Sequence, residues 1–355
     1  MIKANGDTTL SYGSEFRTVK QLEPLLGRHP HFFKLAQVLT YGMPYVFTRE
    51  LDGLTKMTEL QKFLKRGNHK SANYYPGQVP RLLTKDVTHG FSIPIPIRIV
   101  EKIPGAAVQP LGLAQQWALD RDGNREIKFR MTQDLSFATE KEGPPRSINS
   151  RIDMTAYVEM VYGWCLLRIL HYIIAVRIKM PSKIIFICKY DYSDAYRRIA
   201  HSAEAAAQTI ATQGDLAYIS LRLTFGGAPN PPTWCLFSEI VTDLANEISR
   251  CEDWDPEKLR SPAQTETPSP VRIDVEVPLA GGKPMAVEVP ITNQERVGRV
   301  DGFIDDLINV FVDSPVNCGR QPHVVPLAMH ITSRPTPVMA RNQSPGGPCC
   351  PPQNC

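Results

Sequence analysis

The stretch Asp301-Gly-Phe-Ile-Asp-Asp-Leu-Ile-Asn-Val-Phe-Val312 carries two adjacent carboxylates, Asp305 and Asp306, inside a run that is otherwise apolar. The apolar residues favour a β-sheet, whereas aspartate is depleted in strands and costs stability there unless something compensates for it. A divalent metal ion is one such compensation, because Mg²⁺ prefers carboxylate oxygens and substrate phosphates as ligands. The alternative is that the pair forms the tip of a tight hairpin that points into water.

Charge is distributed unevenly along the chain, which has 355 residues and a formal net charge of +4. Residues 1–190 contain 27 Lys or Arg against 16 Asp or Glu, whereas residues 191–355 contain 13 against 20. A basic half beside an acidic half is expected of a protein that binds a polyanion with one part and metal ions with the other. Ordinary variation in surface charge is the alternative.

The eight cysteines are scattered, with neither a CxxC pair nor a Cys/His spacing typical of a zinc site. Cys165, Cys188 and Cys235 lie in apolar segments and are expected to be buried thiols, which favours an intracellular compartment, cytoplasm or nucleus, over secretion. The most apolar long stretch, residues 157–178, is interrupted by Glu159, two arginines and a histidine. A buried helix is therefore expected there rather than a membrane span.

Local patterns predict the secondary structure in outline. Apolar spacing predicts helices at residues 19–26, 31–41, 55–64 and 235–248, and a long helix or a helix pair at 152–178. Strand-like runs are expected at residues 111–119, 126–135, 183–190 and 216–223. Asp120-Arg-Asp-Gly-Asn124 is a strong turn signal, which joins the first two of these strands in a hairpin. The proline-rich segment 76–118 is predicted to be extended and rich in loops up to that hairpin, because proline fixes φ and lacks a backbone donor.

Several residues outside the opening stretch also have functional chemistry. Asp191 follows a predicted buried strand, and a carboxylate at such a strand end is a common metal ligand. Lys128 and Arg130 are two positions apart in a predicted strand, so their side chains share one face and suit a triphosphate. The alternative for these two is a solvent-facing strand edge kept soluble by charge. Gly226 and Gly227 allow the backbone to approach a ligand closely.

These residues stand in an order that resembles the palm of a reverse transcriptase, an RNA-directed DNA polymerase. The three matching motifs are Asp191 with Ala195-Tyr196 (motif A), Phe225-Gly226 running to Ala228-Pro229 (motif B) and Phe303-Ile-Asp-Asp306 (motif C). Upstream, the segments that resemble the fingers hairpin and its continuation are Lys128-Phe-Arg130-x-x-x-Asp134-Leu-Ser136 and Ser147-Ile-Asn149. The likeness covers about residues 80–335 and is nearer to retrotransposon enzymes than to retroviral or telomerase ones.

The resemblance implies an α+β fold of the right-hand polymerase type, with fingers and with an antiparallel palm sheet that has helices on one face. The expected divisions are a helical N-terminal extension (1–75), fingers (76–190), palm with motifs A and B (191–250), an inserted β-ribbon or loop (251–300), palm with motif C and the strand after it (301–340), and a disordered Pro/Cys-rich tail (341–355). The pattern shows no helical thumb after motif C, which predicts the fingers and palm of a larger retroelement polyprotein in truncated form.

The resemblance implies a metal centre. Asp191, Asp305 and Asp306 would hold two Mg²⁺ ions, or Mn²⁺ in their place, with help from the main-chain carbonyl of Tyr192. Such a centre requires Asp191 to meet the pair at the ends of adjacent strands, although it lies 114 positions before Asp305 in the sequence.

The resemblance also implies a nucleotide-binding set. Lys128 and Arg130 would bind the incoming triphosphate, and Tyr196 would exclude a ribose 2′-hydroxyl; the alternative for Tyr196 is a core aromatic. The residues that would line the nucleotide and template side are Phe225, Gly226 and Gly227.

The activity implied by the resemblance is RNA-directed DNA polymerisation. The partners would be an RNA template, a DNA primer, deoxynucleoside triphosphates and other parts of a retroelement polyprotein, with no membrane. One alternative is a catalytically inactive, palm-derived nucleic-acid-binding or scaffold protein, and another is an unrelated α/β protein whose motifs match by chance. The sequence shows no ribonuclease H carboxylate set, no integrase domain and no zinc knuckle.

Overall fold

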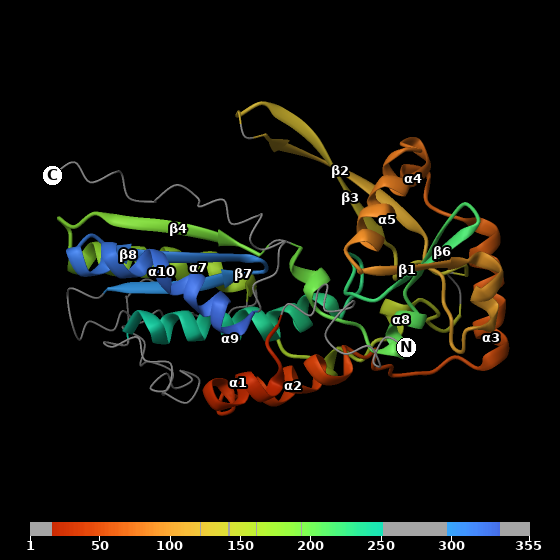
Figure 1. Ribbon diagram of the computed structural model, residues 1–355, viewed down its shortest axis with the longest axis horizontal. Coiled ribbons are helices and arrows are strands. Elements are labelled where there is room, and N and C mark those ends of the chain that lie inside the picture. Colours follow the sequence, from red (N-terminus) through yellow and green to blue (C-terminus); the bar gives the residue numbers. More distant parts are fainter. Residues whose placement is uncertain are drawn as a thin grey trace. The chain divides into compact units, whose positions relative to one another are not determined.

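The computed structural model describes residues 16–250 and 297–333, except for residues 121, 141, 142, 161 and 193. The described chain forms two compact units. The first unit contains Gln37–Val158 and Asp194–Thr233, and the second contains residues 16–36, 159–192, 234–250 and 297–333. Each unit combines helices with small antiparallel sheets, so the fold is α+β in both (Figure 1). The expected ribbon at 251–300 and the tail at 341–355 lie almost entirely outside the described residues.

The first unit contains two sheets and several short helices. Its strands are β1 (Ser92–Pro96), β2 (Leu111–Leu119), β3 (Arg125–Gln133), β5 (Ile210–Gln213) and β6 (Leu216–Ser220). Its helices are α3 (Gly53–Arg66), α4 (Lys70–Tyr74), α5 (Gln78–Thr88), α6 (Ile148–Arg151) and α8 (Ala203–Ala207), with short 3₁₀ segments η1 (Ile97–Lys102), η2 (Met154–Ala156) and η4 (Ala195–Arg198). One sheet has the order β1-β6-β5, and the other is the hairpin β2–β3.

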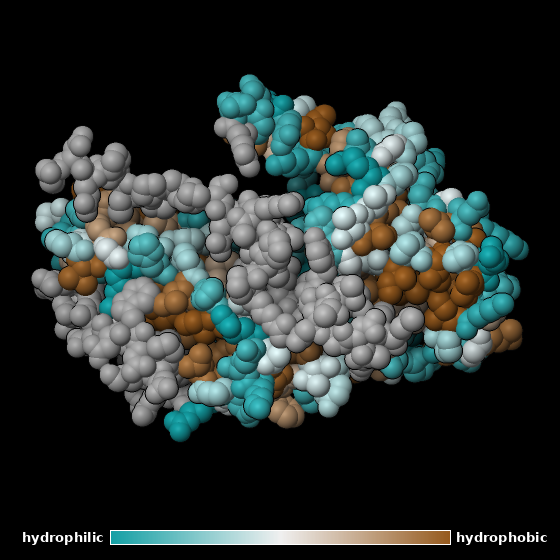
Figure 2. Space-filling view, in the orientation of Figure 1, coloured by the Kyte–Doolittle hydropathy of each residue, from teal (hydrophilic) through white to brown (hydrophobic). Residues whose placement is uncertain are grey.

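The hairpin β2–β3 confirms the turn that the sequence predicts. Both strands are nine residues long and pair from Leu111 with Gln133 to Leu119 with Arg125. The side chain of Asp120 accepts hydrogen bonds from the backbone N–H groups of Asp122 and Asn124, which closes the turn locally. The hairpin projects from the rest of its own unit (Figure 1), and an apolar patch is visible on it (Figure 2). Its large exposed apolar side chains are Trp117, Leu119 and Ile127.

The second unit is built around a three-stranded sheet of order β4-β8-β7, with β8 in the middle (Figure 1). Its strands are β4 (Ile185–Asp191), β7 (Gly298–Phe303) and β8 (Asp306–Val312). Its helices are α1 (Val19–Leu26), α7 (Cys165–Lys179) and α10 (Pro315–Thr332), preceded at α7 by the 3₁₀ turn η3 (Tyr162–Trp164). Two helices, α2 (Phe32–Tyr41) and α9 (Asn230–Arg250), begin in one unit and end in the other.

Helices lie against both faces of this sheet, whereas helices on one face were expected. Val310 and Val312 belong to the same apolar cluster as α7. Asn309, which points to the opposite face by the alternation of a strand, donates a hydrogen bond to the Gln321 carbonyl oxygen in α10 at 2.8 Å. A partly buried ion pair also joins α7 to β7, in which Arg168 donates to Asp301 at 2.6 Å.

Two predicted elements are wrong in extent. Helix α5 occupies residues 78–88, where extended chain was expected. Pro80 is the third residue of this helix, and the first four N–H groups of a helix have no intrahelical partner, so proline costs little there. A long helix or a helix pair was predicted at 152–178, but the α-helix there begins only at Cys165. Near the start of that range, the Asp153 side chain accepts a hydrogen bond from the N–H of Thr155 and caps the short 3₁₀ turn η2.

Candidate metal centre

The acidic pair of the opening stretch lies at a hairpin turn, and Asp191 lies opposite it. Strand β4 ends with Asp191, strand β8 begins with Asp306, and these two residues are direct partners in the antiparallel register. Phe303 pairs with Asp306 on the other side, so the turn between β7 and β8 consists of Ile304 and Asp305 alone. The hairpin-tip alternative and the metal-site hypothesis are therefore compatible, because the turn presents both carboxylates beside the end of β4.

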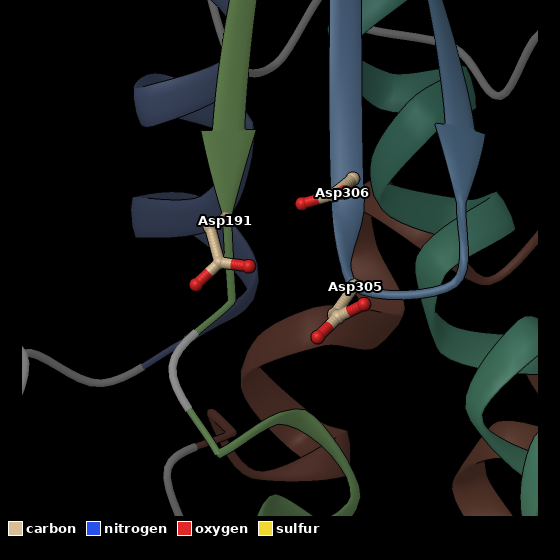
Figure 3. A group of neighbouring side chains, drawn as sticks. All are labelled: Asp191, Asp305 and Asp306. Carbon is tan, nitrogen blue, oxygen red and sulfur yellow. The ribbon is translucent and has the colours of Figure 1, made fainter. Parts of the chain in front are cut away.

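The three carboxylates converge. One oxygen each from Asp191, Asp305 and Asp306 can be chosen so that all three atoms lie within 4.8 Å of one another. Figure 3 shows the Asp191 and Asp306 side chains pointing toward each other from neighbouring strand ends, with Asp305 beside them on the turn. Three hard anionic oxygens at such spacing are the donor set that Mg²⁺ and Mn²⁺ prefer. The convergence that the sequence argument required is thus present.

The electrostatics of the cluster favour a cation. Partial burial, and then the negative charges of Asp305 and Asp306, raise the pKa of Asp191 to about 6. Burial disfavours the charged carboxylate, and carboxylates this close also repel one another, so Asp191 binds a proton more tightly than an isolated aspartate does. A divalent ion would remove this repulsion by replacing the proton with two positive charges.

A lysine already contributes positive charge to the cluster. The Nζ atom of Lys189 lies 2.9 Å from a carboxylate oxygen of Asp306. Its hydrogen bond to Asp306 raises the pKa of Lys189 against the opposing effect of desolvation. Lys189 precedes Asp191 by two positions in β4, so both side chains lie on the same face of the sheet. Sequence reasoning missed this residue, although the two-residue spacing to a candidate ligand was a usable signal.

The turn that carries Asp305 is held by non-local hydrogen bonds. Ile304 has a φ of +57°, a left-handed conformation that is rare for a β-branched residue and costs of the order of 1–3 kcal/mol. The indole Nε1–H of buried Trp234 donates to the Ile304 carbonyl oxygen at 2.6 Å. The backbone N–H of Tyr192 donates to the Asp305 carbonyl oxygen at 2.9 Å, next to Asp191. These two bonds fix the strained turn relative to β4.

The aromatic rings behind the turn reinforce this arrangement. Tyr192 and Trp234 are both almost completely buried, and their rings meet edge to face with centroids 5.3 Å apart. Tyr192, expected to contribute its main-chain carbonyl to the metal site, is linked to the cluster here through its N–H. Its side chain belongs to the core of the second unit.

Three of the predicted nucleotide-binding residues come together in the first unit. The guanidinium carbon of Arg130 lies 5.7 Å from the centre of the Phe225 ring, and the Tyr196 ring centre lies 5.3 Å from it. Arg130 extends from β3, and Tyr196 lies in the 3₁₀ turn η4. Tyr196 and Phe225 are both partly exposed, so neither is a fully buried core residue. Arg130, Tyr196 and Phe225 thus form a partly exposed cluster of two aromatic rings and one cation in the first unit.

Gly226 is required by a close approach of two backbone segments. Its φ is +123°, and a Cβ atom there would lie 1.8 Å from the carbonyl oxygen of Gln133 at the end of β3. The N–H of Gln133 donates to the Phe225 carbonyl oxygen at 2.9 Å. Asn149 binds the same loop twice, through its side-chain amide to the Gly226 carbonyl and through its side-chain oxygen to the N–H of Ala228. The loop that begins with Phe225 is therefore fastened to β3.

The other two predicted nucleotide-binding residues of the first unit, Lys128 and Gly227, each lie against a residue close to them in the sequence. Lys128 is exposed on β3 and forms an ion pair with Glu126 at 3.1 Å. A Cβ atom at Gly227 would lie 2.6 Å from the Asn230 side chain, so this glycine is required by packing at the start of α9. The residues Lys128, Arg130, Tyr196, Phe225, Gly226 and Gly227 belong to the first unit, and Asp191, Tyr192, Asp305 and Asp306 belong to the second.

None of the helices in the described part of the chain has the length and apolar character that crossing a membrane requires.

No family model and no curated protein matches the sequence. Among solved structures, the chain is similar to the native protease–reverse transcriptase of prototype foamy virus, with 16% identity and a TM-score of 0.35 over 70% of this chain and 21% of that one. It is also similar to the selenomethionine-labelled CSH mutant of that protein, with 15% identity and a TM-score of 0.38 over 83% of this chain and 25% of that one. The chain thus spans a quarter or less of the length of these two chains.

Proposed function

We propose that this chain carries the fingers and palm of an RNA-directed DNA polymerase from a retroelement, and that it transfers nucleotides by a two-metal mechanism. The observation that carries the proposal is the convergence of Asp191, Asp305 and Asp306 within 4.8 Å at the ends of paired strands. These residues come from two motifs separated by more than 100 positions, and the order of the motifs along the chain matches that of reverse transcriptases.

The three carboxylates would hold two Mg²⁺ or Mn²⁺ ions. When bound, such ions stabilise the negative charge on the attacking primer 3′-oxygen and on the leaving oxygen of an in-line displacement at phosphorus. The part played by this chain is to fix the geometry of the ligands. Asp191 and Asp306 are set by the strand register, and Asp305 is set by the turn that Trp234 and Tyr192 hold.

The residues of the first unit would bind the deoxynucleoside triphosphate. Arg130 would donate bidentate hydrogen bonds from its planar guanidinium to phosphate oxygens. Lys128 would break its ion pair with Glu126 and attract the phosphate by its charge. Tyr196 would pack against the sugar and exclude a ribose 2′-hydroxyl. Phe225 and the backbone at Gly226 and Gly227 would line the side of the nucleotide and template.

The remaining partners follow from the proposed reaction. An RNA template and a DNA primer would be bound in part by the basic residues among positions 1–190, which exceed the acidic ones by 27 to 16. Other segments of a retroelement polyprotein would accompany the chain.

Primer extension tests the proposal. The full chain is incubated with poly(rA)/oligo(dT), dTTP and Mg²⁺, and the wild type is compared with Asp305→Asn and Asp306→Asn. Loss of one metal ligand is expected to reduce extension by about 10²-fold or more, since the metal contributes several kcal/mol to transition-state stabilisation. Asp215→Asn, an exposed aspartate in the first unit outside the cluster, is the matched control and is expected to extend as the wild type does.

Two outcomes would contradict the polymerase proposal. If wild type and Asp305→Asn extend the primer equally, the carboxylates are not catalytic. If the wild type binds primer–template without extending it, the catalytically inactive, palm-derived nucleic-acid-binding protein takes its place.

A further inference from the structure

A small cavity with both polar and apolar lining residues lies in the first unit. It offers about 10 Å³ to the centre of a water-sized molecule. Its polar lining includes Gln133 at the end of β3, Arg197 in η4 and Thr224 immediately before Phe225. Each of these three residues is close in sequence to a predicted nucleotide-binding residue.

Three polar atoms of these lining residues have no hydrogen-bond partner among the described residues. They are Nε2 of Gln133, Nη1 of Arg197 and Oγ1 of Thr224. Gln133 and Thr224 are each only 3% exposed, so solvent does not satisfy them. Gln133 and Arg197 each use another side-chain atom in a hydrogen bond: Gln133 Oε1 accepts from Ser220 at 3.3 Å and Arg197 Nη2 donates to Asp86 at 2.7 Å.

We propose that this cavity is a specific hydration site, in which one buried water molecule joins β3, η4 and the segment before Phe225. A water needs about 10–15 Å³ of such space and two to four polar partners, and the cavity provides both. The water oxygen accepts from the Gln133 amide and from the Arg197 guanidinium. The two water hydrogens are donated to Thr224 Oγ1 and to the carboxylate of Asp86, which also lines the cavity.

The charges at the cavity favour water over an anion. Arg197 is the lining cation, and it is already paired with the Asp86 carboxylate at 2.7 Å. The local charge is therefore close to neutral, and a halide would have to lie beside a carboxylate. A neutral molecule that both accepts and donates hydrogen bonds fits the set of lining groups.

The hydration site would position the nucleotide-binding residues, a consequence that rests on the proposed function. Gln133 lies three residues after Arg130, Arg197 follows Tyr196, and Thr224 precedes Phe225. The direct hydrogen bond from the Gln133 N–H to the Phe225 carbonyl already ties two of these segments together. The water would connect η4 to these two segments as well. Gln133, Arg197 and Thr224 are therefore positioning residues. Each acts through the nucleotide-binding residue close to it in its own segment, namely Arg130, Tyr196 and Phe225 in turn.

The sign of a stability change tests for the water. Thr224→Val keeps the shape of the side chain and removes its hydroxyl. If the hydroxyl is bonded to a buried water, the substitution is expected to lower the folding equilibrium constant about 5-fold, the loss of one hydrogen bond. If the cavity is dry, the same substitution removes an unsatisfied polar group and raises that constant. Thr233→Val is the matched control, because the buried Thr233 hydroxyl donates to the Pro229 carbonyl at 2.7 Å and its removal must lower the constant.

Detection of the water completes the test. Nuclear Overhauser contacts from a long-lived water to the Gln133 side-chain amide are expected in the wild type and are expected to weaken in Thr224→Val. Stabilisation by Thr224→Val, or the absence of these contacts, would overturn the hydration site. Stability that rises with chloride but not with an equal concentration of a larger anion would overturn it in favour of a halide.

Nucleotide kinetics separate this inference from the proposed function. In an active enzyme, Thr224→Val is expected to raise KM for dTTP several-fold with a smaller change in kcat, and to leave the Mg²⁺ dependence unchanged. A wild type without polymerase activity would refute the proposed function alone, because the stability and Overhauser measurements on the full chain still decide the hydration site. An unchanged KM in an active Thr224→Val enzyme would refute the positioning role.

Discussion

Replacing Asp191 by asparagine should have opposite effects on stability without and with metal. Partial burial of Asp191, and then the negative charges of Asp305 and Asp306, raise its pKa from 3.8 to about 6 in the metal-free protein. A folded-state pKa above the unfolded value means that ionisation costs stability, beginning as pH rises through about 4 and reaching its full extent above about 6. Asp191→Asn removes this cost, so it should stabilise the metal-free protein at neutral pH.

Solvent screening limits the stability gain expected from Asp191→Asn. A shift of about two pKa units corresponds to at most about 3 kcal/mol, and the exposure of Asp191 reduces this to about 1 kcal/mol. Mg²⁺ binding, by contrast, should raise the stability of the wild type. At a free Mg²⁺ concentration about ten times the dissociation constant, binding to the folded state adds about 1.4 kcal/mol of stability. The asparagine variant, with one ligand fewer, should gain little from Mg²⁺.

Urea denaturation at pH 7.5, in EDTA and in Mg²⁺, measures both effects. Asp191→Asn should be more stable than the wild type in EDTA and less stable in Mg²⁺, and in EDTA the difference between them should vanish below pH 4. Asp215→Asn should show neither change. A variant that is equally destabilised in both buffers, or a wild type that Mg²⁺ does not stabilise, would refute the metal centre.

Three further substitutions test the surroundings of the two sites. Lys189→Met removes a cation that competes for Asp306 and should tighten Mg²⁺ binding by roughly 3- to 10-fold in a metal titration, whereas Lys183→Met should not. Trp234→Phe deletes the hydrogen bond to Ile304 and should cost about 1–2 kcal/mol in urea denaturation and weaken Mg²⁺ binding; unchanged Mg²⁺ affinity would show that the turn does not depend on the indole. Gly226→Ala should cost about 3 kcal/mol or more, because its Cβ meets the Gln133 carbonyl, whereas Gly105→Ala, in open space at a φ of +71°, should cost only about 1 kcal/mol.

Elements specified by local interactions could be predicted from the sequence. The hairpin β2–β3 is one, because Asp120 makes its turn with residues two and four positions away. Helix α1 also matches its prediction, since its apolar spacing and its capping residues are both local. The helix α5 could not be predicted by the rule that proline disfavours helices. Its only internal proline is at the third position, where the missing N–H has no role, and the helix boundary that makes this so is not apparent from composition.

The metal-ligand residues of the candidate site could be predicted from the sequence, but the residues that hold them in place could not. The aspartates could be selected because carboxylates interrupt or end apolar runs. Trp234, Gln133 and Arg197 have no such signature, since their relevance depends on which distant atoms they meet. The signal for Lys189 was weaker, namely its two-residue spacing from Asp191. A lysine in a strand is ordinary until the register places it diagonally across from Asp306.

The sequence by itself determined that residues 301–312 form β-structure that carries two adjacent acids, with a tight hairpin turn as one of two placements for the pair, because alternation and side-chain type act over a few residues. Only the tertiary structure decided that β8 pairs with β4 in the register that sets Asp306 opposite Asp191. It also decided that Trp234 holds Ile304 in a conformation which that residue would avoid alone. The physical reason is that register and buried hydrogen bonds join segments far apart in the chain, and their energies depend on how the whole core packs rather than on any one segment.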